Sequence, residues 1–168
     1  MQNLLRSFAF TSLIITGAIF GIFYAWICTV MWGLDAADPR IAIAAMQAMN
    51  AAIRNAAFSI AFFGTPIICW LTALIAWRAG TGKVAVAFAL AGLVFMLGTA
   101  IPTGTISVPM NQALALLDIP KDEALATSIW QDYSPKWQLW NQIRAGFAGI
   151  SLLFVGYGIF QLEKSGRV

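Results

Sequence analysis

The chain has 168 residues and a net charge of +3; 60% of its residues are apolar and only 10% are charged. A soluble domain of this length carries about 25% charged residues, so the composition excludes an ordinary soluble enzyme or binding module. The sequence contains no histidine, which removes the commonest metal ligand and the usual general base near neutral pH. Haem and copper are poorly supported, and we expect no metal, no cofactor and no nucleic-acid partner.

Four segments lack Asp, Glu, Lys and Arg altogether: Ser7 to Leu34, Asn55 to Trp77, Val84 to Leu117, and Ala145 to Leu162. A helix rises about 1.5 Å per residue, so about 20 apolar residues cross a hydrocarbon core about 30 Å thick. The segments predict an all-α integral membrane four-helix bundle, and the lipid bilayer as its first partner. We expect one domain over residues 1–168, with spans at about 7–32, 54–77, 84–108 and 141–162.

The first span is too long for the apolar part of a signal peptide, and we interpret it as a retained helix. Gly17 and Gly21 form a small-xxx-small pair, which lets another backbone approach closely. Trp26 and Trp32 near the far end of this span fit an aromatic belt at the membrane surface.

A second helical segment starts at Asp38 and Pro39, which are a typical N-cap and first helical residue. Residues 40–55 are rich in Ala and contain neither Gly nor Pro. We therefore expect this helix to continue directly into the second span as its extended outer part.

The third span contains Pro102, Gly104 and Pro109, and we expect a broken helix whose irregular end is buried in protein or lines a cavity. The next segment, 118–136, is the most polar part of the chain and is expected at the outer surface. Residues 137–144 then open the fourth helix.

Four spans place both termini and the 78–83 turn on one side of the membrane. Lys and Arg divide five against five between the two sides. On the first side they are concentrated in short tails and one tight turn, where the positive-inside rule is strongest. We predict a multi-pass protein of the cell membrane (plasma or inner) with both termini in the cytoplasm.

Polar and aromatic residues from three elements are expected to meet at the outer mouth of the bundle. They are Asn50 and Arg54 before the second span, Pro109 and Asn111 at the end of the third, and Trp137, Trp140, Asn141 and Arg144 on one face of the fourth. Polar groups that face the interior of a membrane bundle are functional candidates by default. This set predicts an aromatic-lined, cationic pocket at the outer leaflet.

More ordinary roles remain open for the same residues. Arg54 and Arg144 are also compatible with snorkelling anchors at the membrane surface. Asn111 is compatible with a cap on backbone freed by Pro109, and the tryptophans with an aromatic belt. The pocket is favoured because Trp, Asn and Arg share one helical face, whereas a belt residue should face lipid.

Three stretches of the chain follow one another with the spacing of a known family. They are Ala42 to Asn50 followed by Asn55, Phe58 and Phe63-Gly64-Thr65; Val108 to Asn111 with Leu114; and Trp137, Trp140-Asn141 and Arg144. In these stretches the chain resembles the anthrone-oxygenase-like family of small four-helix membrane proteins. The resemblance implies a cofactor-independent oxidation of anthrones, which are reduced tricyclic phenols, to anthraquinones by molecular oxygen.

The resemblance also implies roles for the pocket residues. The expected catalytic donors to the substrate oxyanion are Arg144, Asn141, Asn111 and Arg54. The expected substrate-binding residues are Trp137, Trp140, Asn50 and Pro109. The general base stays open among Asp35, Asp132 and Tyr133.

An oxidoreductase acting on a lipophilic aromatic or quinone-like molecule is thus the first functional hypothesis. The alternative is a non-enzymatic membrane protein, either an accessory subunit of a membrane complex or a lipophile-binding protein, with a complex or homo-oligomer partner still open. A channel or transporter is poorly supported because no charge lies within a predicted span.

Overall fold

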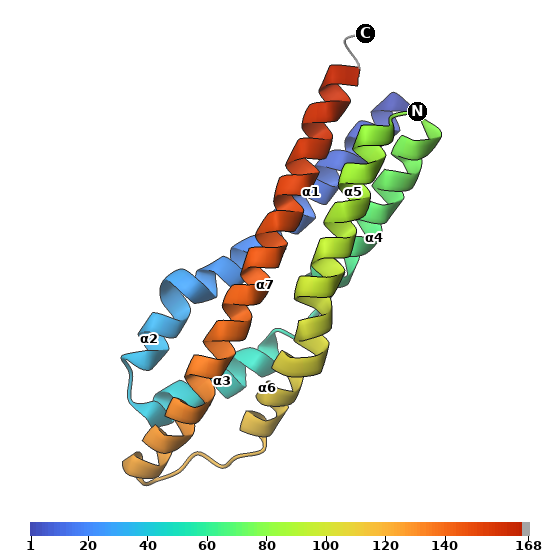
Figure 1. Cartoon of the computed structure of the whole chain (residues 1–168). Coiled ribbons are helices and arrows are strands. Elements are labelled where there is room, and N and C mark those ends of the chain that lie inside the picture. Colours follow the sequence, from blue (N-terminus) through green and yellow to red (C-terminus); the bar gives the residue numbers. More distant parts are fainter. Residues whose placement is uncertain (166–168) are drawn as a thin grey trace.

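The computed structural model describes residues 1–165, and within them every regular element is a helix (Figure 1). Four helical stretches are long and apolar enough to cross a membrane: Gln2–Asp35, Ala56–Arg78, Gly82–Ala115 and Glu123–Ser165. The predicted all-α bundle with four membrane helices is confirmed. The described ends of the chain lie at the same end of the bundle as the turn between the second and third stretches (Figure 1).

The four stretches contain the following elements. The first comprises α1 (Gln2–Ala25), the π-helical η1 (Trp26–Val30) and α2 (Met31–Asp35), and it is followed by the separate helix α3 (Pro39–Ala52). The second is α4 (Ala56–Arg78), and the third comprises α5 (Gly82–Phe95), the π-helical η2 (Met96–Ala100) and η3 (Thr103–Ser107), and α6 (Val108–Ala115). The fourth is α7 (Glu123–Ser165).

The helices differ in length, and this divides the molecule into two parts. With 23 residues, α4 is about 35 Å long, close to the thickness of a hydrocarbon core. The other three stretches have 34, 34 and 43 residues, and their extra length lies at the end away from the termini (Figure 1). We call α2, α3, α6 and residues 123–137 of α7 the distal part, which extends beyond a membrane that fits α4.

The expected continuous helix from residue 40 into the second span is wrong. Helix α3 stops at Ala52 and α4 starts at Ala56. Asn55 accounts for the break, because its Oδ1 accepts a hydrogen bond from Phe58 N at 3.0 Å while its Nδ2 donates to Ala52 O at 2.9 Å. A single amide side chain thus ends one helix and caps the next.

The start of α3 agrees with the sequence prediction. Asp38 is the N-cap, Pro39 is the first helical residue, and the Asp38 carboxylate accepts a hydrogen bond from Arg40 N at 2.8 Å. The Arg40 guanidinium also donates to this carboxylate. These hydrogen bonds, foremost that from the Arg40 side chain, lower the pKa of Asp38 to about 2.

The third stretch is not broken into unwound backbone, as the prolines had suggested. The helix widens into π turns instead: Pro102 directly precedes η3, and Pro109 lies in the first turn of α6. Pro lacks the N–H that an α-helix needs, and a π turn accommodates that loss while the chain stays helical.

The fourth helix starts 14 residues before the expected opening at Trp137, because α7 already begins at Glu123. The Asp122 carboxylate accepts a hydrogen bond from Ala124 N at 3.0 Å and so caps its first turn. Pro135 is tolerated inside this helix because the carbonyl it leaves without a partner belongs to the exposed Gln131.

Buried residues form three apolar clusters, two of them outside the distal part and one within it. The cluster of the distal part includes Met31, Ile43, Met46, Leu114 and Trp130.

Within residues 1–165, a Cβ added to Gly17 or Gly21 would meet nothing within 4 Å, so the expected close approach of another backbone is not made there. It is made elsewhere: a Cβ on Gly98 would lie 1.9 Å from the Phe147 ring.

Candidate functional site

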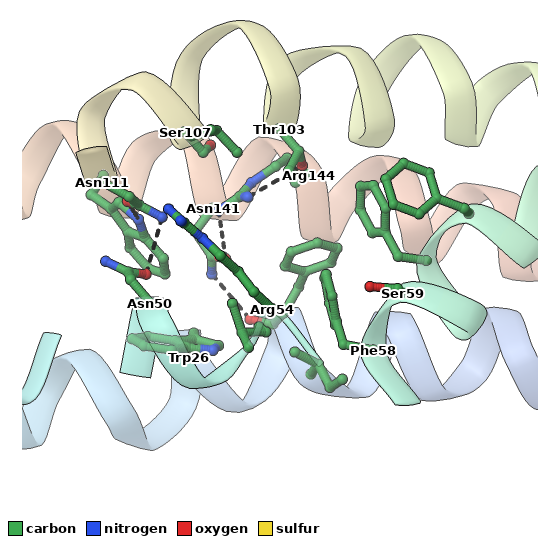
Figure 2. Close-up of a pocket in the computed structure, with 17 residues that line it drawn as sticks. Trp26, Asn50, Arg54, Phe58, Ser59, Thr103, Ser107, Asn111, Asn141 and Arg144 are labelled. Carbon is green, nitrogen blue, oxygen red and sulfur yellow. Dashed lines mark hydrogen bonds between the residues drawn. The ribbon is translucent and has the colours of Figure 1, made fainter. Parts of the chain in front are cut away.

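A cavity of about 260 Å³ lies where the membrane part meets the distal part (Figure 2). It is enclosed by α1 and η1, the end of α3, the break before α4, the first turns of α4, η3 with α6, and the middle of α7. Its lining residues are Ile22, Phe23, Trp26, Asn50, Ile53, Arg54, Phe58, Ser59, Phe62, Phe63, Thr103, Ser107, Val108, Asn111, Trp137, Asn141 and Arg144. Chain segments from all parts of the sequence therefore build one site.

Arg144 carries a buried charge on the α7 side of this cavity. Its side chain donates hydrogen bonds to Thr103 Oγ1 and Asn141 Oδ1, each at 3.3 Å. The guanidinium carbon lies 4.8 Å from the centre of the Phe23 ring and 5.5 Å from that of Trp137, so cation–π contacts compensate part of its desolvation. With 5% of its surface exposed, Arg144 is not a snorkelling anchor.

Asn141 fixes the position of Arg144 and connects two membrane helices. Its Nδ2 donates to the Phe23 carbonyl of α1 at 3.0 Å, and its Oδ1 accepts the hydrogen bond from Arg144. Both ends of this buried amide are therefore occupied by protein groups. Asn141 positions the guanidinium and leaves the cavity-facing contacts to Arg144.

Asn111 is the centre of a second network on the distal side. Its Oδ1 accepts hydrogen bonds from Tyr133 Oη at 2.8 Å and Trp137 Nε1 at 3.0 Å. Its Nδ2 donates to Asn50 Oδ1 at 3.0 Å. The side chain thus joins α3, α6 and α7, and it does not cap the backbone near Pro109.

Aromatic rings form the remaining walls. Trp26 packs against Trp137 with ring centres 4.8 Å apart, and Phe58 stacks on Phe62 at 5.2 Å. The assignment of Trp26 to an aromatic belt is therefore corrected, because this ring lines the cavity. Trp32 lies in α2 and has 74% of its surface exposed.

Several buried polar atoms have no hydrogen-bond partner within residues 1–165. Three of them belong to cavity residues: Asn50 Nδ2, Ser107 Oγ and Arg144 Nε. An unpartnered buried donor costs about 1–3 kcal/mol, so native structures rarely leave one without a reason. Three in one cavity favour a ligand that brings hydrogen-bond acceptors.

The cavity also has a positive field. Arg54, in the break between α3 and α4, is exposed at its edge, and Figure 2 shows its side chain extended across the cavity toward Asn50 and Asn111. No Asp or Glu of the described residues lines the space. Two guanidinium groups without a carboxylate partner favour an anionic ligand.

Six of the eight predicted site residues line the cavity: Asn50, Arg54, Asn111, Trp137, Asn141 and Arg144. Pro109 and Trp140 are not among the lining residues. Pro109 is exposed on the face of α6 opposite Asn111, since residues two apart in a helix point apart. Trp140, in α7, is half-buried and does not line the cavity.

None of the three candidate bases lines the cavity. Asp35 instead connects α2 to α7 by accepting hydrogen bonds from Trp130 Nε1 at 2.9 Å, Ser134 Oγ at 2.7 Å and Gln138 Nε2 at 2.8 Å. Asp132 is exposed and forms an ion pair with Lys136. The Tyr133 hydroxyl is occupied by Asn111.

The sequence did not indicate the π-helical contributions to the site. Trp26 is the first residue of η1, and Thr103 and Ser107 are the first and last residues of η3. Thr99, in η2, donates a hydrogen bond to Arg144 O at 3.1 Å. Two of the π segments, η1 and η3, therefore place side chains in the cavity, and η2 contacts the backbone of Arg144. Such turns are frequent at functional sites.

Comparison with known protein families matches residues 55–154 to the family described as anthrone oxygenase. The match covers more than half of the 168 residues. It includes the cavity residues of α4, η3, α6 and α7. No curated protein and no solved structure matches the chain.

Proposed function

Because this chain belongs to the anthrone oxygenase family, we propose that it is a membrane oxidoreductase that oxidises a planar, lipophilic phenol or quinone-like molecule with molecular oxygen, without a cofactor. One observation carries the proposal. Asn50, Ser107 and Arg144, which line one aromatic-walled cavity, each have a buried polar atom without a hydrogen-bond partner among the described residues. A flat ring system that bears oxygen atoms complements both features.

The shape of the cavity supports an aromatic ligand. Its volume of about 260 Å³ is slightly below the range for drug-sized ligands, about 300–1,000 Å³, and suits a small molecule. Trp26, Phe58 and Trp137 offer ring faces and edges on which fused rings pack well. The position of the cavity at the end of α4 places it within reach of a molecule dissolved in the bilayer.

The polar side supports stabilisation of an oxyanion. We assign the contacts with the ligand oxygen to Arg144, Asn50 and Ser107, with Arg54 at the edge. Asn141 and Asn111 are positioning residues in this proposal, since their amides are already bonded to protein groups. Fixed donors in a poorly hydrated site stabilise developing negative charge strongly.

The proposed reaction balances without a further reactant. Anthrone loses a proton from the ring carbon opposite its carbonyl and becomes an extended oxyanion. The proton passes to water at the edge of the cavity. The anion reduces oxygen and forms a carbon–oxygen bond, giving a hydroperoxide after protonation. Loss of water from this hydroperoxide leaves the second carbonyl, so anthrone and O₂ become anthraquinone and water.

We place the chain in the cell membrane with both termini in the cytoplasm, and we treat residues 1–168 as one domain. The short tails and the 78–83 turn concentrate their Lys and Arg on the side of the termini, which supports this orientation. The cavity then opens toward the outer leaflet.

Oxygen uptake by the purified protein in lipid nanodiscs, with an anthrone as substrate, tests this proposal. We expect a rate above spontaneous autoxidation that falls by about 100-fold in Arg144→Gln, as for loss of one oxyanion donor. Arg78→Gln is the matched control, because Arg78 is an exposed arginine at the far end of α4. Uptake that is equal in both variants contradicts the proposed site. Binding of anthraquinone without any turnover indicates the lipophile-binding alternative.

A further inference from the structure

A groove lies next to the cavity on the membrane-facing side of the bundle. This groove, of about 390 Å³, lies between α4 and the π segments of the third stretch. Phe62 and Phe63 line both the cavity and the groove. On the other wall, Thr103 lines the cavity and the next residue, Gly104, lines the groove. The two spaces are thus separated by a single layer of side chains.

The groove lies within the part of the molecule that crosses the membrane. Phe63 is seven residues into α4, about 10 Å from its start by helical rise. Phe63, Ile67 and Ile101 have 63%, 55% and 47% of their surfaces exposed. Large apolar side chains exposed at this depth contact lipid chains. A molecule dissolved in the bilayer therefore reaches the groove without crossing water.

The layer between the two spaces has one fixed and one free side chain. Phe62 is 3% exposed and is held by aromatic contacts with Phe58 at 5.2 Å and Phe95 at 5.7 Å. Phe63 touches Phe62 edge-on at 5.2 Å and is otherwise largely exposed. Exposed side chains change rotamer within nanoseconds, so Phe63 is able to swing aside while Phe62 stays.

Gly104 lies on the opposite wall of the groove and has no side chain that could fill the groove. A Cβ added to this residue would meet nothing within 4 Å among the described residues. Its φ is not positive, so the backbone itself does not require glycine at this position. The absence of a side chain here leaves room in the groove, and a larger residue would project into it without disturbing packed neighbours.

We propose that the lipophilic ligand enters the cavity from the bilayer by passing between α4 and η3. The Phe63 side chain is the gate of this passage, and the absence of a side chain at Gly104 leaves the space opposite it open. This route rests on the proposed function, since it requires that the cavity bind a lipophilic aromatic. It adds the source of the ligand: the membrane interior, reached through the side of the bundle.

Binding kinetics in nanodiscs test the route. The probe is a dihydroxyanthraquinone, and binding is followed by quenching of tryptophan fluorescence after rapid mixing, since Trp26 and Trp137 line the cavity. For Gly104→Leu we expect association and dissociation to slow together by about tenfold, or about 1.4 kcal/mol in the barrier, with Kd unchanged. Gly146→Leu is the matched control, because it adds the same side chain at an exposed α7 glycine with nothing within 4 Å.

Phe63→Ala provides a second variant with the opposite expectation. Removing the gate should accelerate association, whereas loss of a ligand contact alone acts mainly on dissociation. Association rates of Gly104→Leu and Phe63→Ala that equal the rate of Gly146→Leu overturn the route alone. A wild-type protein that does not bind the probe overturns both the route and the proposed function.

Discussion

Replacing Asn111 by Ala should destabilise the protein far more than removing only the hydroxyl group of its partner Tyr133. The Asn111 amide accepts two hydrogen bonds, from Tyr133 and Trp137, and donates one to Asn50. The three partners are 7%, 4% and 7% exposed in the order Tyr133, Trp137, Asn50. Water therefore has little access to take over the bonds that the amide makes.

The magnitude follows from the number of groups left without a partner. Asn111→Ala leaves three buried groups unsatisfied, at about 1 kcal/mol or more each, which gives a loss of about 3 kcal/mol. Tyr133→Phe removes only one donor, and Asn111 Oδ1 retains the hydrogen bond from Trp137. Its expected cost is about 1 kcal/mol, the typical net contribution of one hydrogen bond.

Reversible unfolding in mixed micelles, followed by circular dichroism, measures both losses. Gln112→Ala is the control, since it removes an amide from the exposed neighbouring residue of the same helix and should change stability by less than about 0.5 kcal/mol. In the double variant Asn111→Ala/Tyr133→Phe, the second substitution should recover about 1 kcal/mol, because the orphaned hydroxyl is gone. An Asn111→Ala loss no larger than that of Tyr133→Phe would refute the view of Asn111 as the centre of the network.

Three further predictions concern other parts of the chain. The folded pKa of Asp38 is about 2, below the value near 3.9 of an unfolded chain. Its carboxylate therefore stabilises α3 above about pH 4, and this contribution is lost as the pH falls toward 2. The melting temperature of Asp38→Asn, which retains a capping side chain, should vary less between about pH 4 and pH 2 than that of the wild type. Gly98→Ala should cost about 1–3 kcal/mol in micelle unfolding because its Cβ would meet a phenylalanine ring at 1.9 Å, whereas Gly17→Ala should be neutral or slightly stabilising. In a cysteine-free background in whole cells, an impermeant maleimide should label Ser128→Cys but not Lys83→Cys, and the reverse pattern would invert the proposed orientation.

The sequence predicted the four membrane helices because their signal is local. An uncharged run of 20 residues has few alternatives in a bilayer, whatever the neighbouring helices do. The convergence of Asn50, Arg54, Asn111, Trp137, Asn141 and Arg144 on one cavity was also predictable. These residues lie at the same end of their respective spans, and antiparallel neighbours bring such ends together.

The errors arose where side-chain contacts decide the backbone. Helix propensity favours one continuous helix across residues 40–55, but Asn55 bonds to the backbone on both sides of it and interrupts the helix. The π turns of the third stretch follow from how Pro102 is accommodated next to Thr103, whose hydroxyl bonds Thr99 O at 2.7 Å. The extent of α7 was missed because residues 123–136 are too polar for a span, although polarity does not prevent a helix that continues into water.

The distal part has an energetic consequence for the cavity that it covers. In a membrane that fits α4 this part stands in water, so the hydrophobic effect holds together its buried apolar cluster around Met31, Ile43 and Trp130. Helices inside the bilayer lack that driving force and depend on close packing. The stability of a hydrophobic core decreases in urea and on cooling, and its opening raises the heat capacity because apolar surface becomes exposed to water. The distal part should therefore unfold in urea or in the cold while the four membrane helices remain assembled. Cooling would then release a bound ligand before the membrane helices dissociate from one another.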